Sequence, residues 1–198
     1  MKNLNTPEKI HFKAKLQQID KWTILRLDKE ASSKLSTRGL AMIEGTINGL
    51  LFQTAVEPDG KKGHWFEIEK GMQQAIHAQA GDTVDVVIEQ SRDWSEPKVP
   101  SNLKEALTND SKAETTWGVI TPFARWEWIR WIGATKNPET IKKRIGVALS
   151  KLGKGDRRPC CFNSNQCTVP YLSHNGVLLE SEQTSAIKVG INKTKSEK

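Results

Sequence analysis

Alternating apolar and polar residues mark residues 10–91 as a region of β-strands. Phe12, Ala14 and Leu16 alternate with lysine and glutamine, which is the period of a half-buried strand. Related patterns predict strands at 12–16, 22–27, 41–47, 50–56, 64–69 and 84–88. Asn48-Gly49 predicts a hairpin between the third and fourth of these, because a type I′ turn needs positive φ at both positions. With a short helix at 70–79 and a polar loop, with room for a helical turn, at 29–39, the strands predict a small closed β-barrel.

Helical periodicity replaces this alternation after residue 100. Thr121-Pro122 and Asn137-Pro138 have the sequence of helix starts, since Thr or Asn can cap a free N–H and proline needs no donor at the first helical position. After the second start, one apolar stripe follows at helical spacing: Ile141, Ile145, Ala148, Leu149 and Leu152. Shorter helices are predicted at 101–107 and 112–119. The chain is therefore predicted to have an α+β fold.

These patterns divide the chain into five parts. We expect a β-barrel domain at 10–91, a linker with two prolines at 92–100 and a helical domain at 101–155. An irregular, cysteine-containing segment at 156–180 and a disordered tail at 181–198 follow. The helical domain cannot cover all of its own apolar faces, so we expect it to dock onto the barrel.

The helix that begins at Thr121 is apolar around most of its circumference, and such a helix is normally buried. Trp126, Trp128 and Trp131 lie on it. Core packing is the simpler interpretation of these side chains. The alternative is that they line a pocket for a small ligand or a peptide between barrel and helices, because aromatic rings stack on ligands as well as on each other.

Positive charge is concentrated on the two longer helices and the turn after them. The formal net charge of the chain is +7, and residues 121–158 alone have ten Lys or Arg against three Asp or Glu. The candidate anion-binding residues are Lys142, Lys143, Arg144, Lys151, Lys154, Arg157 and Arg158. Such a patch attracts nucleic acid or an acidic protein, although a solvated helix face has the same composition.

Three cysteines, Cys160, Cys161 and Cys167, fall close together with His174 beyond them. Their odd number argues against a disulfide framework. Adjacent cysteines rarely both ligate one zinc ion, so we expect no metal and favour local packing of the thiols. Redox sensing beside nearby arginines is the alternative, because cations lower a thiol pKa.

No catalytic signature stands out elsewhere. The histidines are not spaced as partners of a nucleophile, and Gly60…Gly63 is a turn and not a phosphate-binding loop. We therefore expect neither enzymatic activity nor a cofactor. The absence of a long apolar run argues against a membrane partner, and a polar N-terminus favours a cytoplasmic location.

Two family resemblances cover about residues 10–155. Gly45-Thr46-Ile47-Asn48-Gly49 and Gly81-Asp82-Thr83-Val84 resemble the barrel of the domain-of-unknown-function 1905 (DUF1905) family. The second segment resembles the YdeI/OmpD-associated family, often labelled bacteriocin-protection, at Trp131-Ile132, Ala134, Lys136, Glu139-Thr140 and Arg144-Ile145. Members of that family often have Arg directly after the Glu-Thr pair, where this chain has Ile141. Any role of that arginine in the family is therefore not expected in this chain.

The resemblance implies a closed barrel of the double-split type followed by a helical domain. It implies no mechanism, because these families have no established biochemical activity. The expected function is that of a non-enzymatic binding protein, with the barrel as scaffold and the basic helical face as the contact for nucleic acid or an acidic partner. The alternative is a ligand-binding or peptide-binding module that acts in stress or toxin protection by sequestration.

Overall fold

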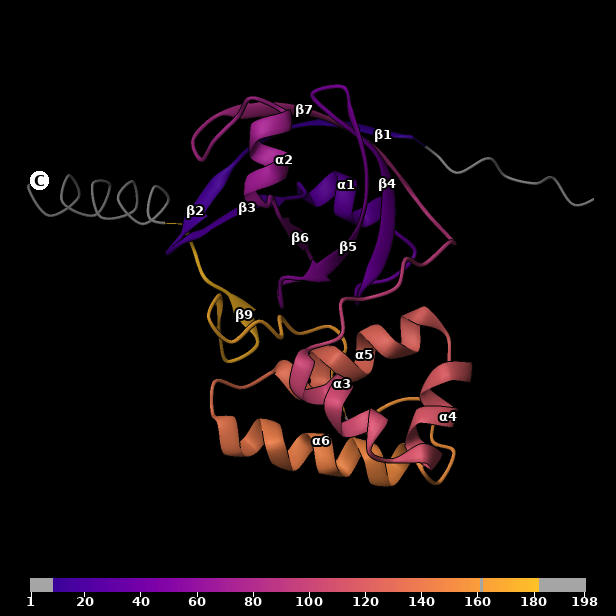
Figure 1. The fold of residues 1–198 in the computed structure, drawn as a ribbon. Helices are drawn as coiled ribbons and strands as arrows, with labels where there is room; N and C mark the ends of the chain where they lie inside the picture. Colours follow the sequence, from indigo (N-terminus) through magenta and orange to yellow (C-terminus); the bar gives the residue numbers. More distant parts are fainter. Residues whose placement is uncertain (1–8, 161, 182–198) are drawn as a thin grey trace, which may run out of the picture.

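The computed structural model describes residues 9–160 and 162–181 (Figure 1). Seven antiparallel strands form one strongly curled sheet in the order β1-β7-β4-β5-β6-β3-β2. The strands are β1 (Ile10–Lys15), β2 (Gln17–Ile19), β3 (Trp22–Arg26), β4 (Ala41–Ile47), β5 (Leu50–Pro58), β6 (His64–Glu67) and β7 (Thr83–Gln90). Two short helices, α1 (Lys29–Lys34) and α2 (Lys70–Ala75), interrupt them. Together with the helices that follow, the sheet confirms the mixed α+β class.

The sheet is a half-barrel, so the prediction of a closed barrel is wrong. β1 and β2 are the two ends of the strand order, and within the described residues they do not pair with each other. They follow one another along the chain, separated only by Leu16. The Leu16 N–H donates to the Asp82 carbonyl at 2.8 Å, and the Leu16 carbonyl accepts from the Gly81 N–H at 2.8 Å. These bonds extend the pairing of β1 with β7, and a single residue between β1 and β2 is too short a connection for the two strands to turn back and pair with each other.

The core of the sheet follows the predicted alternation. In β7, Val84, Val86 and Ile88 are buried inside the curl, whereas Thr83 and Asp85 face solvent. The register of β7 against β1 and β4 places these valines beside other inward-facing apolar residues. Burial of this one face holds the register, because a shift by one residue would expose the whole apolar set.

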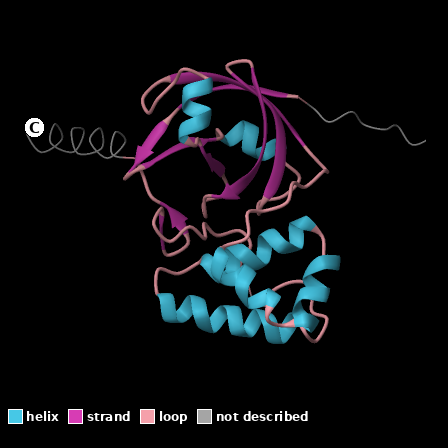
Figure 2. Cartoon of the chain, in the orientation of Figure 1, coloured by secondary structure: helices cyan, strands magenta, loops and turns pink. Residues whose placement is uncertain are grey.

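Four helices follow the sheet: α3 (Ser101–Thr108), α4 (Ser111–Val119), α5 (Pro122–Gly133) and α6 (Pro138–Leu152). Figure 2 shows them gathered on one side of the sheet domain. The predicted helix starts are confirmed. The Thr121 hydroxyl accepts from the Ala124 N–H at 3.3 Å, and the Asn137 side chain accepts from the N–H groups of Glu139 and Thr140 at 2.9 and 3.3 Å.

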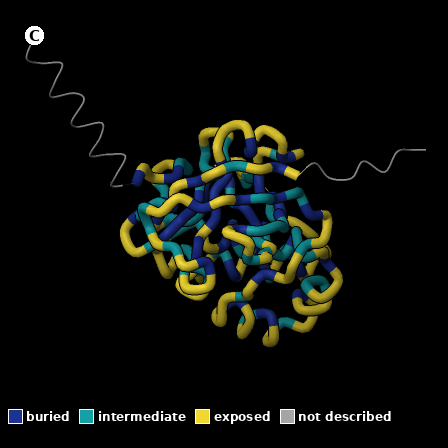
Figure 3. The backbone as a smooth tube through the Cα atoms, turned by 90° about the horizontal axis from the view of Figure 1, so that it is seen from above, coloured by how far each residue is buried: buried dark blue, intermediate teal, exposed yellow. Residues whose placement is uncertain are grey.

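The helical domain docks onto the sheet, as expected from its apolar faces. Leu40, Met42 and Ala55 pack against Trp94, Phe123 and Trp126. In the view from above, buried positions lie in the interior of the molecule and exposed positions on the turns around it (Figure 3). The three aromatic side chains are partly buried, so each contributes transfer free energy in proportion to the apolar area that it removes from water.

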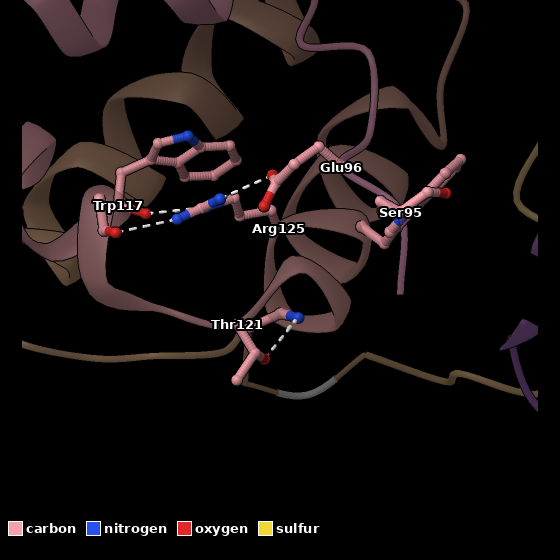
Figure 4. A network of polar contacts seen from close by, with 8 residues as sticks. Ser95, Glu96, Trp117, Thr121 and Arg125 are labelled. Atoms are coloured by element: carbon pink, nitrogen blue, oxygen red, sulfur yellow. Dashed lines mark hydrogen bonds and ion pairs between the residues drawn. The ribbon is translucent and has the colours of Figure 1, made fainter. Parts of the chain in front are cut away.

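Arg125 of α5 anchors the linker (Figure 4). Its guanidinium forms an ion pair with Glu96 at 2.6 Å, and it donates to the carbonyls of Trp117 and Gly118 at 2.9 and 3.0 Å. The two carbonyls belong to the last turn of α4, whose C=O groups lack partners inside the helix. Arg125 therefore caps one helix and fixes the linker against another.

The segment after α6 lies on the protein, as predicted, but it is not wholly irregular. It forms a hairpin of β8 (Ser173–His174) and β9 (Val177–Leu178). Asn175 and Gly176 turn the hairpin with φ of 49° and 76°. The expected disordered tail lies outside the described residues except for Ser181, which is buried. None of the described helices is long and apolar enough to span a membrane.

Candidate functional site

A pocket of about 610 Å³ opens where the C-terminal segment passes the ends of α5 and α6. Figure 1 shows this segment, with β9, between the sheet and α6. The helices contribute Trp131 and Arg144 to the lining, and the connection between α5 and α6 contributes Ala134 and Lys136. The C-terminal segment contributes Phe162, Asn163, Gln166, Cys167, Thr168, Pro170, Ser173, His174, Asn175 and Gly176. The volume lies within the usual range for small-molecule sites.

Arg144 is held in a fixed position in this wall. One terminal nitrogen, Nη1, donates to the Trp131 carbonyl at 2.7 Å, and the guanidinium carbon lies 5.5 Å from the centre of the Trp131 ring. Trp131 is in the last turn of α5, where a carbonyl needs an external donor. Within the described residues, Nε and Nη2 of Arg144 have no hydrogen bond. They remain available as donors.

Lys136 is a second cation of the pocket. It is exposed, and its ammonium lies 5.0 Å from the centre of the Tyr171 ring. Neither Lys136 nor Arg144 forms an ion pair with a described residue, and the pocket lining contains no carboxylate. The other polar groups of the lining are amides, hydroxyls and one imidazole. This arrangement favours an anion with several hydrogen-bonding groups.

A buried ion pair supports the pocket from behind. Arg130 of α5 donates from Nε to Glu57 of β5 at 2.9 Å and from Nη2 to the Gln166 carbonyl at 3.2 Å. Its guanidinium stacks on Phe162, 5.3 Å from the ring centre. Burial raises the pKa of Glu57, and the charge of Arg130 opposes that shift. Since Gln166 and Phe162 line the pocket, this pair fixes the pocket wall to both domains.

The predicted basic residues do not all have the same environment. Lys142, Lys143, Lys154 and Arg157 are exposed. Lys151 pairs with Asp156 at 3.5 Å. Arg158 pairs with Glu127, which is buried, and stacks on Phe123 at 4.9 Å. Of the seven candidates, only Arg144 lines the pocket.

The three candidate tryptophans also lie in different environments. Trp131 lines this pocket, which lies between the helices and the C-terminal segment and contains no described residue of the seven-stranded sheet. Trp128 is fully buried; it packs edge-on against Trp131 and donates from its indole to the Arg157 carbonyl at 3.1 Å. Trp126 belongs to the interface with the sheet and donates to the Ser95 carbonyl at 3.0 Å. Core packing therefore accounts for Trp126 and Trp128.

The described cysteines occupy different environments. Cys160 is exposed and its thiol raises the pKa of Lys151, whereas Cys167 is buried beside Trp65, and burial raises the pKa of its thiol. Cys161 lies outside the described residues. Across residues 9–160 and 162–181, no three His, Cys, Asp or Glu side chains come close enough together to hold a metal ion. His174 lines the pocket.

Most of the pocket was not predicted, because its lining between 162 and 176 lacks periodicity. The sequence of this segment does contain one turn signal. Asn175-Gly176 is the same dipeptide that predicted the β4–β5 turn, and it places the hairpin that carries Ser173 and His174. Lys136 was noted only through the family resemblance.

Fold and pocket define a class of two-domain proteins, in which a curled β domain precedes a helical domain with a polar pocket at its edge. Residues 12–88 match the family described as domain of unknown function (DUF1905), and residues 96–155 match the family described as bacteriocin-protection, YdeI or OmpD-associated. No curated protein gave a significant match to the chain. The helical side of the pocket falls inside the second family's range, and the C-terminal side falls outside both.

Proposed function

We propose that this chain is a binding protein whose pocket takes a small anionic ligand. The observation that supports this most directly is the position of Arg144, which is fixed by the Trp131 ring and carbonyl while two of its nitrogens keep free donors. Lys136 adds a second positive charge to a wall without carboxylates. In a protein of this family, protection would then act through sequestration of the ligand.

Pre-organisation explains why Arg144 suits this role. An arginine side chain loses up to about 2 kcal/mol of rotamer entropy when a ligand fixes it. Here the contacts with Trp131 have already restricted the side chain, so that loss does not recur on binding. Each charge-assisted hydrogen bond to the ligand would contribute about 1.5–3 kcal/mol.

A nucleic-acid surface on α6 has weaker support. Lys151 and Arg158 are paired with carboxylates, which reduces the positive field of the predicted patch. Lys142, Lys143, Lys154 and Arg157 remain exposed. A polyanion would contact these four, and its binding would fall steeply with salt concentration.

Native mass spectrometry of protein purified from its host tests the proposal. We expect a bound small molecule on the wild-type chain and on Lys143→Gln, and its loss on Arg144→Gln. The two substitutions remove the same charge from neighbouring positions, and Lys143 is outside the pocket. Retention by Arg144→Gln, or nucleic acid lost specifically from Lys143→Gln, would overturn the pocket as the site.

A further inference from the structure

Building on the proposed function, we infer that the ligand is a phosphate monoester of a small, hydrophilic molecule. The pocket presents two cations, Arg144 and Lys136, and no carboxylate. A monocarboxylate ligand carries one negative charge and would leave one of these cations without a counter-charge. A phosphate monoester carries about −1.5 to −2 at pH 7 and matches both.

The geometry of the two donors also fits a phosphate. Arg144 presents a planar fork with free donors at Nε and Nη2, while Lys136 presents a single ammonium group. A fork binds two oxygens of one tetrahedral group, and an ammonium binds a third as a point charge. Each cation also contacts an aromatic ring, Arg144 that of Trp131 and Lys136 that of Tyr171.

The rest of the lining indicates what the phosphate is attached to. Its uncharged polar side chains are Asn163, Gln166, Thr168, Ser173 and Asn175. Amides and hydroxyls of this kind form hydrogen bonds with the hydroxyl or carbonyl groups of a ligand. An alkyl chain in the same place would displace water from these polar groups without giving them hydrogen-bond partners, which costs free energy. The ligand body is therefore hydroxylated or amide-like, and a lipid tail does not fit.

Arg130 provides an independent observation. Its side chain is 3% exposed, and Nη1 is buried without a hydrogen-bond partner among the described residues. A buried cationic N–H without an acceptor is costly. Arg130 contacts Phe162 and Gln166, which both line the pocket. An oxygen of the ligand body that reaches past Phe162 would satisfy this donor.

Isothermal titration with matched probes tests the inference. The probes are ribose 5-phosphate, inorganic phosphate, ribonate as a carboxylate of similar size, and ribose. We expect ribose 5-phosphate to bind at least about tenfold more tightly than each of the others, since it alone supplies both the dianion and the polar body. Arg144→Gln and Lys136→Gln each weaken it by about tenfold or more, and Lys143→Gln leaves it unchanged.

The outcomes separate this inference from the proposed function. Ribonate binding that equals or exceeds ribose 5-phosphate binding, and that still depends on Arg144, overturns the phosphate assignment and leaves an anion pocket. If inorganic phosphate binds as tightly as ribose 5-phosphate, the inference that the pocket recognises a hydrophilic body attached to the phosphate is overturned. If no probe binds at millimolar concentration to protein that circular dichroism shows to be folded, both the phosphate inference and the proposed function are overturned.

Discussion

Arg130 of α5 and Glu57 of β5 form a buried ion pair, with Nε and Oε2 2.9 Å apart, that joins the helical domain to the sheet. Their side chains are only 3% and 16% exposed. At this depth the loss of hydration of two charges rivals their attraction. The pair therefore fixes the position of one domain on the other more than it stabilises the fold.

Arg130→Met should destabilise the protein by about 3–5 kcal/mol, because it leaves the Glu57 carboxylate buried without its counter-charge. The double variant Arg130→Met/Glu57→Leu should recover most of that loss, since no charge then remains buried. Urea unfolding followed by tryptophan fluorescence measures both. A double variant that stays as unstable as Arg130→Met would show that the pair stabilises the fold outright.

Gly60 should be sensitive to substitution because the turn before β6 touches the β8–β9 hairpin. Gly60 has φ of 78°, and an added Cβ would overlap the Gly176 carbonyl oxygen. Gly49 has a similar φ of 83° with nothing near the added Cβ. Both Ala variants carry backbone strain of about 1–2 kcal/mol. Gly60→Ala also has the overlap with Gly176, so it should be the less stable of the two in urea unfolding. Because Gly176 lines the pocket, Gly60→Ala should also bind the pocket ligand more weakly. Equal stability of the two variants would exclude a tight contact there.

Protonation of His64 should destabilise the fold. The ring is buried, with Nε2 3.0 Å from the Gly39 carbonyl and Nδ1 3.3 Å from the Ser32 hydroxyl, and burial lowers its pKa from 6.5. The unfolded chain therefore binds the proton more readily. The contribution of neutral His64 is complete above pH 6.5 and is lost as pH falls below it towards the folded-state pKa.

Urea unfolding at several pH values measures this effect. The slope of unfolding free energy against pH below 6.5 should be smaller in His64→Gln than in the wild-type chain. An unchanged slope in His64→Gln would mean that His64 does not carry the acid sensitivity.

Arg125→Ala should cost about 2–3 kcal/mol, because it removes one ion pair and leaves two helix-end carbonyls without their donor. Arg125→Lys should recover only part of this, since an ammonium cannot reach three acceptors with the geometry of a guanidinium. Arg157→Ala, at an exposed arginine, is the control for charge. Thermal unfolding compares the three, and equal melting temperatures for Arg125→Ala and Arg157→Ala would contradict the capping role.

The sequence predicted helices and strands well where the residues of one short segment determine the structure of that segment. Thr121 and Asn137 cap their helices through their own neighbours, and the alternation in β7 needs only one buried face. The three residues of β2 were too few to show a period, so the strand was missed. α1, predicted as a loop with room for a helical turn, is six residues long and capped by Asp28.

The candidate site depends on contacts that sequence spacing does not contain. Arg158 pairs with Glu127, 31 positions away, so a count of charges overstated the free positive field. The pocket needs α5, α6 and the C-terminal segment together, and only Trp131 and Arg144 were among the predicted site residues. The prediction of a closed barrel was wrong for a similar reason, since the strand order, with β1 and β2 at its two ends, is set by pairing between distant segments.

A crystal structure of the protein grown with ribose 5-phosphate tests the central claim most directly. The account predicts density for the phosphate within hydrogen-bonding distance, about 2.7–3.2 Å, of the Arg144 guanidinium and close to the Lys136 ammonium. The ribose should extend towards Gln166 and Phe162. Density for water alone in the pocket at saturating ligand, or the ligand bound along Lys142 and Lys143, would contradict it.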